Sequence, residues 1–191
     1  LSYAQFAYGH PVIGYREDIE LAELHQVQTF QKSWYRPENA VLSIVGDVET
    51  ERAFDLVHEL FGGLRMGDPP PPLGLYEPKR MRTVTERIND RLARAPALFV
   101  NHQSVPYSDP DFFVYEVIET LLFRGPSSRL IRKLVIEESQ ALQLTGGYEA
   151  HRGPSLFSFF AIMHEDGSPS RLADLYQSQL EQLVSEPLSN D

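Results

Sequence analysis

Six histidines supply most of the metal-binding and acid-base chemistry open to this chain. They are His10, His25, His58, His102, His151 and His164. A zinc site on one helix needs two histidines a turn apart, with a glutamate nearby as the base. Only "HELFG" from His58 comes near this pattern, and Gly62 stands in place of the second histidine. We interpret His58 as a solvated or half-buried helix residue.

Two further pairs of polar residues and one triplet are candidates for chemistry. His151 and His164 could meet across a predicted hairpin, but no acidic third ligand stands at a readable spacing. Glu137, Glu138 and the "HED" at 164–166 could perform acid-base work. We interpret the glutamate pair as a solvated helix face and "HED" as a turn.

The remaining motifs lack the features of a nucleophile or phosphate site. "FRGPSSRL" leads into a helix as a phosphate-binding turn does, but it has no P-loop lysine or glycine spacing. "GGYEAHRG" is glycine-rich without a fingerprint, and no G-x-S-x-G sequence or cysteine occurs. The sequence therefore predicts no catalytic residue and no metal ligand within residues 1–191, and it leaves the substrate-binding residues unassigned.

Composition narrows the class of partner. The chain is 42% hydrophobic and 23% charged, enough apolar content for a core, and its net charge is −10. A negative field disfavours nucleic acid and anionic membranes as partners.

The most apolar run, "SLFSFFAIM", is far shorter than the roughly 20 residues of a membrane span. The absence of cysteine is compatible with periplasm or cytoplasm, and the start at Leu1 leads us to expect an excised piece of a longer protein.

The first third of the chain predicts a helix, a strand and a helix. Apolar residues recur at helical spacing from Asp18, and Pro37 should end that helix near Tyr35. Asn39 to Val48 is rich in β-branched residues and closes on a Gly-Asp turn, which predicts a strand. A second helix follows from Glu49 or Thr50 and stops at Gly62-Gly63.

A proline-rich segment then divides the chain. "RMGDPPPPLGLYEPKR" at 65–80 cannot continue a helix or a sheet, which predicts a linker stiffened by polyproline geometry. We therefore expect residues 1–64 to be the end of one domain and residues 81–191 to form a second domain.

The second domain predicts the order β-β-α-α-β-β-α. The expected elements are strands in "RTVTERIND" and "APALFVNHQSV", a helix in "YSDPDFFVYEVIETLLF" capped by Ser108 or Asp109, a helix in "GPSSRLIRKLVIEES" capped by Ser127 or Ser128, strands at 142–150 and 155–163 joined by "HRGP", and a last helix from Ser168-Pro169. This order is typical of an α+β fold with a sheet covered by helices, not of a parallel doubly wound sheet.

The chain resembles a known peptidase family from about Tyr8 to Glu138. "YGHPVIGYREDIELAELHQVQTFQKSWYRPENAVLSIVGDV" and "SDPDFFVYEVIETLLFRGPSSRLIRKLVIEE" are similar to the M16 metallopeptidases, which include the mitochondrial processing peptidase, pitrilysin and insulin-degrading enzyme. The resemblance implies an α+β fold of the M16 peptidase (LuxS/MPP-like) type, with the tail of a preceding similar domain. It also implies that the zinc motif, an inverted H-x-x-E-H with a downstream glutamate, lies upstream of this chain, so no catalytic residue is carried over.

M16 enzymes also have a second half, which lacks zinc. There an arginine and, about two helical turns further on, a tyrosine help to bind substrate. Ile136 and Leu142 stand at those places here, and Tyr148 could substitute only if the alignment slips. The missing pair indicates that the parent protein is the zinc-bearing half.

The resemblance thus implies the non-catalytic C-terminal region of a zinc metalloendopeptidase subunit, a hydrolase, forming part of a chamber that encloses peptide substrates. We expect residues 1–191 alone to hold no zinc and to be inactive, with zinc in the parent protein. The expected partners are peptides and a second M16-type half or a second copy. Two alternatives stay open: a catalytically inactive homologue acting as a binding or scaffold subunit, and a stand-alone module that pairs a sheet edge with a peptide.

Overall fold

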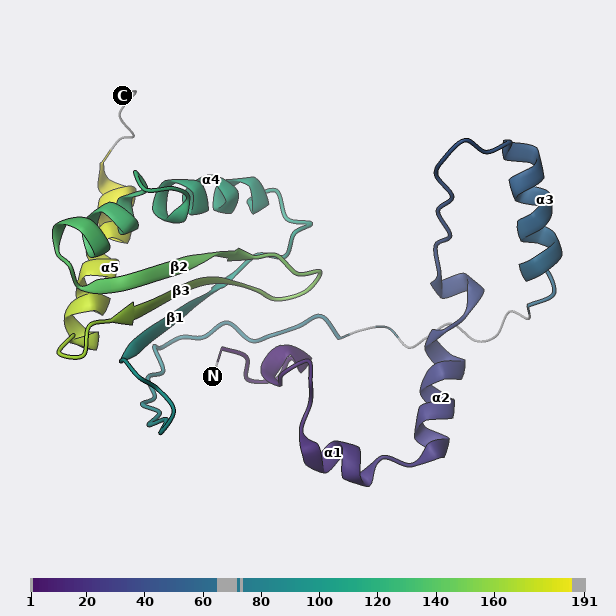
Figure 1. Cartoon of the computed structure of the whole chain (residues 1–191), viewed down its shortest axis with the longest axis horizontal. Helices are drawn as coiled ribbons and strands as arrows, with labels where there is room; N and C mark the ends of the chain where they lie inside the picture. Colours follow the sequence, from purple (N-terminus) through teal and green to yellow (C-terminus); the bar gives the residue numbers. More distant parts are fainter. Residues whose placement is uncertain (1, 65–71, 73, 187–191) are drawn as a thin grey trace. The chain divides into compact units, whose positions relative to one another are not determined.

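The structure is a computed structural model that describes residues 2–64, 72 and 74–186. It divides into two compact units, one made of Leu1–Gly9 with Leu75–Asp191 and the other of His10–Gly74 (Figure 1). We call them the sheet unit and the helical unit. Half of the segment predicted as a linker, residues 65–71 and 73, lies outside the described residues.

The described part of the helical unit contains three α-helices, α1 (Arg16–Leu21), α2 (Leu24–Trp34) and α3 (Thr50–Phe61). The prediction of a single helix from Asp18 to Tyr35 is wrong, because the helical conformation is interrupted between α1 and α2. Glu23 and Gln26 form a reciprocal capping box in which the Gln26 side chain accepts from the Glu23 backbone amide at 2.8 Å. This cap starts a new helix where the apolar periodicity alone would continue the old one.

The strand predicted over Asn39–Val48 is not formed. Pro37–Asn39 makes a single 3-10 turn, and no strand is assigned at residues 41–45 of the described chain. Val41 is 97% exposed, because nothing described in the helical unit pairs with this segment or covers it. The predicted start and stop of α3 are confirmed, since Gly62 caps it by donating its amide to the His58 carbonyl.

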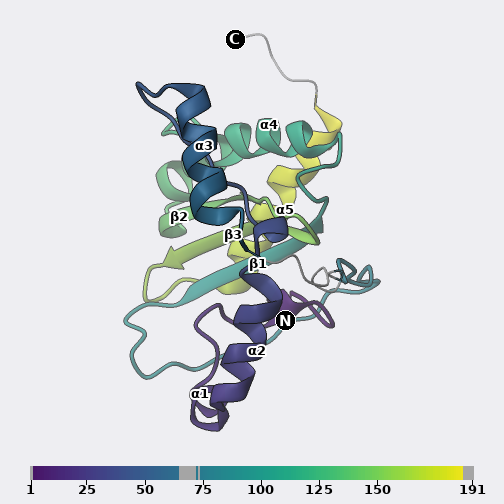
Figure 2. The same ribbon diagram turned by 90° about the vertical axis from the view of Figure 1, so that its right-hand side faces the viewer.

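The sheet unit is built on three antiparallel strands, β1 (Ala97–Ser104), β2 (Ala141–Glu149) and β3 (Ser155–Met163). Their order is β1-β3-β2, so β3 is central and β2 is an edge (Figure 2). The predicted β2 and β3 hairpin is confirmed. The strand predicted in "RTVTERIND" is wrong, because residues 82–90 are exposed and form no ladder with any described strand.

Two α-helices and a wider π-helical segment lie on one face of this sheet: α4 (Phe112–Phe123), η3 (Ile131–Glu137) and α5 (Pro169–Ser185). Asp109 rather than Ser108 accepts near the start of α4, from the Asp111 amide at 2.9 Å. Neither Ser127 nor Ser128 caps the next helix, whose N-cap is Leu130 without a side-chain bond. The chain instead turns at Gly125, where φ is +86°.

The core lies between that face and the helices. Its fully buried members come from every layer: Leu122, Leu130, Leu134, Phe159, Ala161, Met163 and Leu172. Phe159 stacks on Tyr176 of α5 with ring centroids 4.4 Å apart, which joins the central strand to the last helix. None of the described helices has both the length and the hydropathy needed to cross a bilayer.

Candidate functional site

The face of the sheet that no described helix of this unit covers carries the candidate site. Strand register sets its side chains into cross-strand rows, because alternate residues of each strand point to one face. The rows are Phe99-Phe160-Thr145, Asn101-Ser158-Gly147 and Gln103-Leu156-Glu149. The first row is bulky, whereas the β3 and β2 members of the second are a serine and a glycine.

Small residues in that second row leave a hollow, which we call the sheet hollow. Its volume is about 270 Å³, and its lining includes Phe99, Phe160, Ser158, Gly147 and Glu149. The Phe99 and Phe160 rings lie 6.1 Å apart, and Phe99 is 59% exposed. Gly147 has φ +143°, a conformation that residues with side chains rarely adopt. The sequence places glycine here because the backbone requires it.

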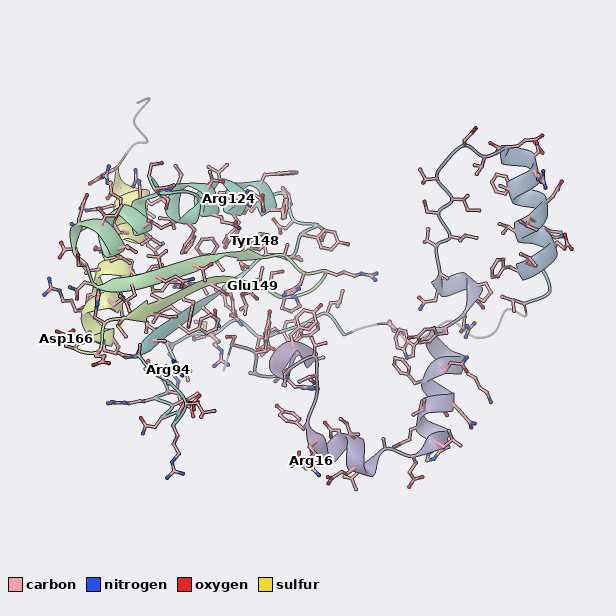
Figure 3. The ribbon with its side chains drawn as sticks, viewed as in Figure 1. Arg16, Arg94, Arg124, Tyr148, Glu149 and Asp166 are labelled. Carbon is pink, nitrogen blue, oxygen red and sulfur yellow. The ribbon has the colours of Figure 1, made fainter. Side chains whose placement is uncertain are left out.

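Two carboxylates border the sheet hollow, and their partners differ. Glu149 accepts from the Ser158 hydroxyl at 2.7 Å, through Oε1. Glu119 of α4 reaches the edge of β2, where its Oε2 accepts from the Tyr148 amide at 2.9 Å and its Oε1 from Arg124 Nε at 3.0 Å. Tyr148 lies toward α4 and Glu149 on the other side of β2 (Figure 3). Glu119 is therefore neutralised by an arginine, whereas no arginine or lysine in the described part of the chain pairs with Glu149.

The N-terminal residues Ser2–Gly9, here called the strap, belong to the same unit and border this face. The carboxylate of Glu77 accepts from the backbone amides of Ala4, Gln5 and Phe6, at 2.6, 3.0 and 2.8 Å. Asn101 of the second row donates to the Ser2 hydroxyl at 2.5 Å. The strap thus fixes the β1 side of the uncovered face.

Electrostatics at the strap follow from these contacts. Desolvation opposes ionisation of Glu77, but the three backbone amides outweigh it and hold the pKa of Glu77 below its usual range. Tyr3 donates its hydroxyl to the Pro154 carbonyl at 3.0 Å. Burial, followed by the nearby charge of Glu149, raises the pKa of Tyr3 to about 12. Both groups therefore keep their ordinary charge states at neutral pH.

A second, larger hollow of about 580 Å³ lies at the end of the sheet near the β2–β3 turn. It is lined by Leu75, Tyr76, Glu77 and Lys79, by Gln103–Pro106, by Tyr115 and by Arg152–Ser155. The Ser104 hydroxyl is buried here without a hydrogen-bond partner in the described part of the chain. Glu77 already accepts hydrogen bonds from the strap. This hollow therefore mainly belongs to the surface on which residues 2–9 lie.

The histidines do not gather into a metal site. In residues 2–64, 72 and 74–186, no group of three or more histidine, aspartate and glutamate side chains could hold an ion. His151 precedes β3 and contacts Tyr8, with ring centroids 4.7 Å apart, whereas His164 follows the end of β3. A nine-residue strand of about 3.3 Å per residue separates them, so they do not meet across the hairpin. His102 packs on Tyr176 at 5.8 Å, and burial lowers its pKa.

The glutamate pair proposed for acid-base work is an ion-pair network. Lys133 contacts Glu137 at 3.3 Å and Glu138 at 3.1 Å, and Arg171 of α5 contacts Glu138 at 3.2 Å. The bond to Lys133 is the main reason that the pKa of Glu138 is lowered. These contacts join η3 to α5 at the surface, which agrees with the interpretation of a solvated helix face.

Sequence comparison now gives the family. A family model described as the peptidase M16 inactive domain matches residues 22–191. This chain belongs to the peptidase M16 inactive domain family. The resemblance drawn from the sequence is confirmed.

One relative of this M16 domain is named as a zinc protease and another as a subunit of a processing peptidase. Zinc protease PqqE of Helicobacter pylori is 25% identical over 186 residues, covering 96% of this chain and 41% of that protein. The beta subunit of the mitochondrial-processing peptidase of Dictyostelium discoideum is 24% identical, covering 92% of this chain and 39% of that protein. The chain therefore spans about two-fifths of the length of these curated relatives.

Solved structures confirm the α+β fold of the M16 peptidase type. A protease from Helicobacter pylori superposes with a TM-score of 0.84 at 24% identity, covering 93% of this chain and 44% of that one. An M16 inactive domain from Pseudomonas fluorescens superposes with a TM-score of 0.71 at 18% identity, covering 97% of this chain and 45% of that one.

The M16 positions considered for substrate binding are now placed. Ile136 and Leu142 are 61% and 53% exposed. Tyr148 is only 8% exposed, and its hydroxyl donates to the Val105 carbonyl at 2.5 Å under α4. Its ring stacks on Tyr115 with centroids 5.2 Å apart. Tyr148 is thus a core residue in this structure.

Sequence reasoning missed the residues of the sheet hollow. They come from three strands, and only the strand register brings them together. One signal was present in the sequence, since Gly146-Gly147 lie inside a predicted strand. Glycine within a strand marks a bulge or a close approach of another group.

Proposed function

We propose that this chain is the non-catalytic C-terminal region of a zinc-dependent M16-type metalloendopeptidase subunit, and that its uncovered sheet face forms part of a wall enclosing peptide substrates. The M16 inactive domain match over residues 22–191 carries this proposal. The exposed ring of Phe99, set beside polar groups on a sheet face that no described helix of the unit covers, supports the assignment of the wall.

The domain division is part of the same proposal. We place residues 1–64 with the end of the first M16-like domain, residues 65–80 as the linker and residues 81–191 as the second domain. In the described part of the helical unit no residue is buried, and Phe54 of α3 is 70% exposed. Such surface is costly to leave in water, so the apolar sides of α2, α3 and residues 41–45 fit a role in completing a larger domain.

We further propose that zinc belongs to the parent protein and is held outside residues 1–191, and that the parent works with a second M16-type half or a second copy. One relative named as a zinc protease, and one named as a beta subunit, support this. Peptide substrates would then reach this chain only as part of that assembly.

The test uses the complete protein and a peptide longer than about ten residues. Phe99→Asp places a charge on the uncovered face and should lower kcat/KM about tenfold while zinc content stays at the wild-type level, since a single unfavourable contact of about 1.4 kcal/mol has that effect. Phe113→Asp is the matched control, because Phe113 is 73% exposed on α4. Equal loss in both variants would contradict the wall.

The same measurement separates the inactive-homologue alternative. A complete protein that binds no zinc and turns over no peptide, but still binds peptide, would be a scaffold subunit. We expect zinc and turnover in the complete protein and neither in residues 1–191 alone. Stoichiometric zinc on the 191-residue chain, retained after mild chelation, would overturn the assignment.

A further inference from the structure

We propose that the sheet hollow binds the guanidinium side chain of an arginine in a bound peptide. This inference rests on the proposed peptide-handling role and names the side-chain chemistry that the wall would select. Size comes first. At about 270 Å³ the hollow is smaller than the 300–1,000 Å³ typical of sites for small-molecule ligands, and it suits one long side chain.

The walls suit a flat cation with an apolar stem. Phe99 and Phe160 stand side by side in one row, with rings 6.1 Å apart and inclined at 66°. Phe99 leaves 59% of its surface exposed, so its ring is accessible from solvent. Aromatic faces attract arginine more than aliphatic surfaces do, and the methylene stem of arginine gains from apolar contact.

A carboxylate at the border of the hollow supplies the negative charge. Oε1 of Glu149 accepts from Ser158, and in the described part of the chain no hydrogen bond or ion pair engages Oε2. The lining of the hollow includes no lysine or arginine, and the other bordering carboxylate, Glu119, is paired with Arg124. A guanidinium fork matches a carboxylate better than a point ammonium does, and the net charge of −10 favours its approach.

The edge of β2 decides how such a peptide lies. A strand added beside β2 would need the outward amide of Tyr148, but the Glu119 carboxylate already accepts from it. The peptide therefore crosses the uncovered face and does not extend the sheet at this point. The strap bounds that path on the β1 side, where Ser2 contacts Asn101.

The experiment measures binding of two synthetic peptides to the full 191-residue chain by NMR titration. Both are dodecapeptides with blocked termini and no charged residue outside the central position, which is arginine in one peptide and its neutral isostere citrulline in the other. We expect the arginine peptide to bind about tenfold more tightly. The amides of Gly147 and Ser158 should shift with it.

Matched variants test which residues of the hollow produce the selectivity for arginine over citrulline. Glu149→Gln keeps the shape of the side chain and an oxygen for Ser158, and it should reduce the arginine-to-citrulline ratio to about one. Glu165→Gln, an exposed glutamate in the β3–α5 turn, makes the same change in net charge and should keep the ratio. Phe99→Leu should lower the ratio by about threefold, whereas Phe113→Leu on α4 should not.

The outcomes separate this inference from the function on which it rests. If both peptides bind equally to the wild-type chain, or if Glu149→Gln keeps the selectivity, the arginine site is wrong and the peptide wall stands. If neither peptide binds, the arginine site is wrong, and the peptide wall is then decided by the kcat/KM comparison of Phe99→Asp with Phe113→Asp in the complete protein. A lysine peptide that binds as tightly as the arginine peptide would also overturn the choice of guanidinium.

Discussion

The two units of this chain use similar amphipathic helices with opposite results. In the sheet unit, α4 and α5 bury Leu122 and Leu172 completely. In the helical unit, α2 and α3 leave Phe30 57% and Phe54 70% exposed. The difference is the sheet, which offers the first pair a flat apolar surface. An apolar stripe on a helix therefore predicts the helix, but a core needs a second surface to receive the stripe.

Truncation of an aromatic residue in each unit gives the largest expected contrast. Phe159→Ala should lower the free energy of unfolding by about 4 kcal/mol, because Phe159 is fully buried and its loss leaves a cavity against Tyr176. Phe30→Ala should cost less than about 0.5 kcal/mol. Urea unfolding followed by circular dichroism measures both. Similar losses in the two variants would show that the helical unit has a core of its own.

Substitution of one glycine in each unit gives the next largest expected difference in stability. Gly146→Ala should cost about 1 to 3 kcal/mol, because the new Cβ would lie 2.5 Å from Cε1 of the Phe123 ring. At Gly63, by contrast, nothing lies within 4 Å of the added atom. Gly63→Ala should therefore change stability by less than about 0.5 kcal/mol. A harmless Gly146→Ala would mean that the helix-covered face of β2 is looser than the contacts show.

Helix caps give a smaller contrast. Ser168 caps α5 by accepting from the Arg171 amide at 3.4 Å, whereas Glu49 makes no side-chain cap on α3. Ser168→Ala should lower the thermal midpoint by the equivalent of about 0.5 to 1 kcal/mol. Glu49→Ala should leave it unchanged within error, measured on the same scan. A larger effect at Glu49 would reveal a contact made by the helical unit.

The smallest expected effect lies within the sheet unit, at the strap. The folded-state pKa of Glu77 lies below its ordinary value, so its bonds to the strap stabilise the folded state above that ordinary value and are lost as the pH falls through the folded pKa. The amide signals of Ala4, Gln5 and Phe6 should shift on acidification while those of β3 stay in place. Glu77→Gln should remove this transition. An unchanged acid transition in that variant would place its origin elsewhere.

Much of the fold follows from local signals in the sequence. The β2–β3 hairpin, α3, α4 and α5 each have a periodic apolar pattern bounded by a turn or cap, and all are confirmed. The strands predicted at 39–48 and 82–90 are wrong for one reason: a strand is stabilised by its neighbour, and neither segment has one in the described structure. The helix over 18–35 is wrong because a capping box outweighs periodicity at Glu23.

The candidate site could not be predicted to the same extent. Absence of a catalytic motif followed from spacing alone, and the family resemblance followed from two long motifs. The sheet hollow depends on register, which pairs Phe160 with Phe99 on one side and Thr145 on the other. A slip of one residue would send Glu149 to the helix-covered face. No local pattern in the sequence determines that register.

The contact between Glu119 and the outer amide of Tyr148 also bears on how copies of this domain behave when crowded. Exposed strand edges are the usual starting points for aggregation, because each copy offers the next a row of free backbone groups. Here the Glu119 carboxylate already accepts a hydrogen bond from one of those groups. Any copy that paired with the edge of β2 would have to remove water and Arg124 from that carboxylate. A copy that added a strand beside Tyr148 would have to break this hydrogen bond, which disfavours polymerisation of the sheet at this point of the β2 edge.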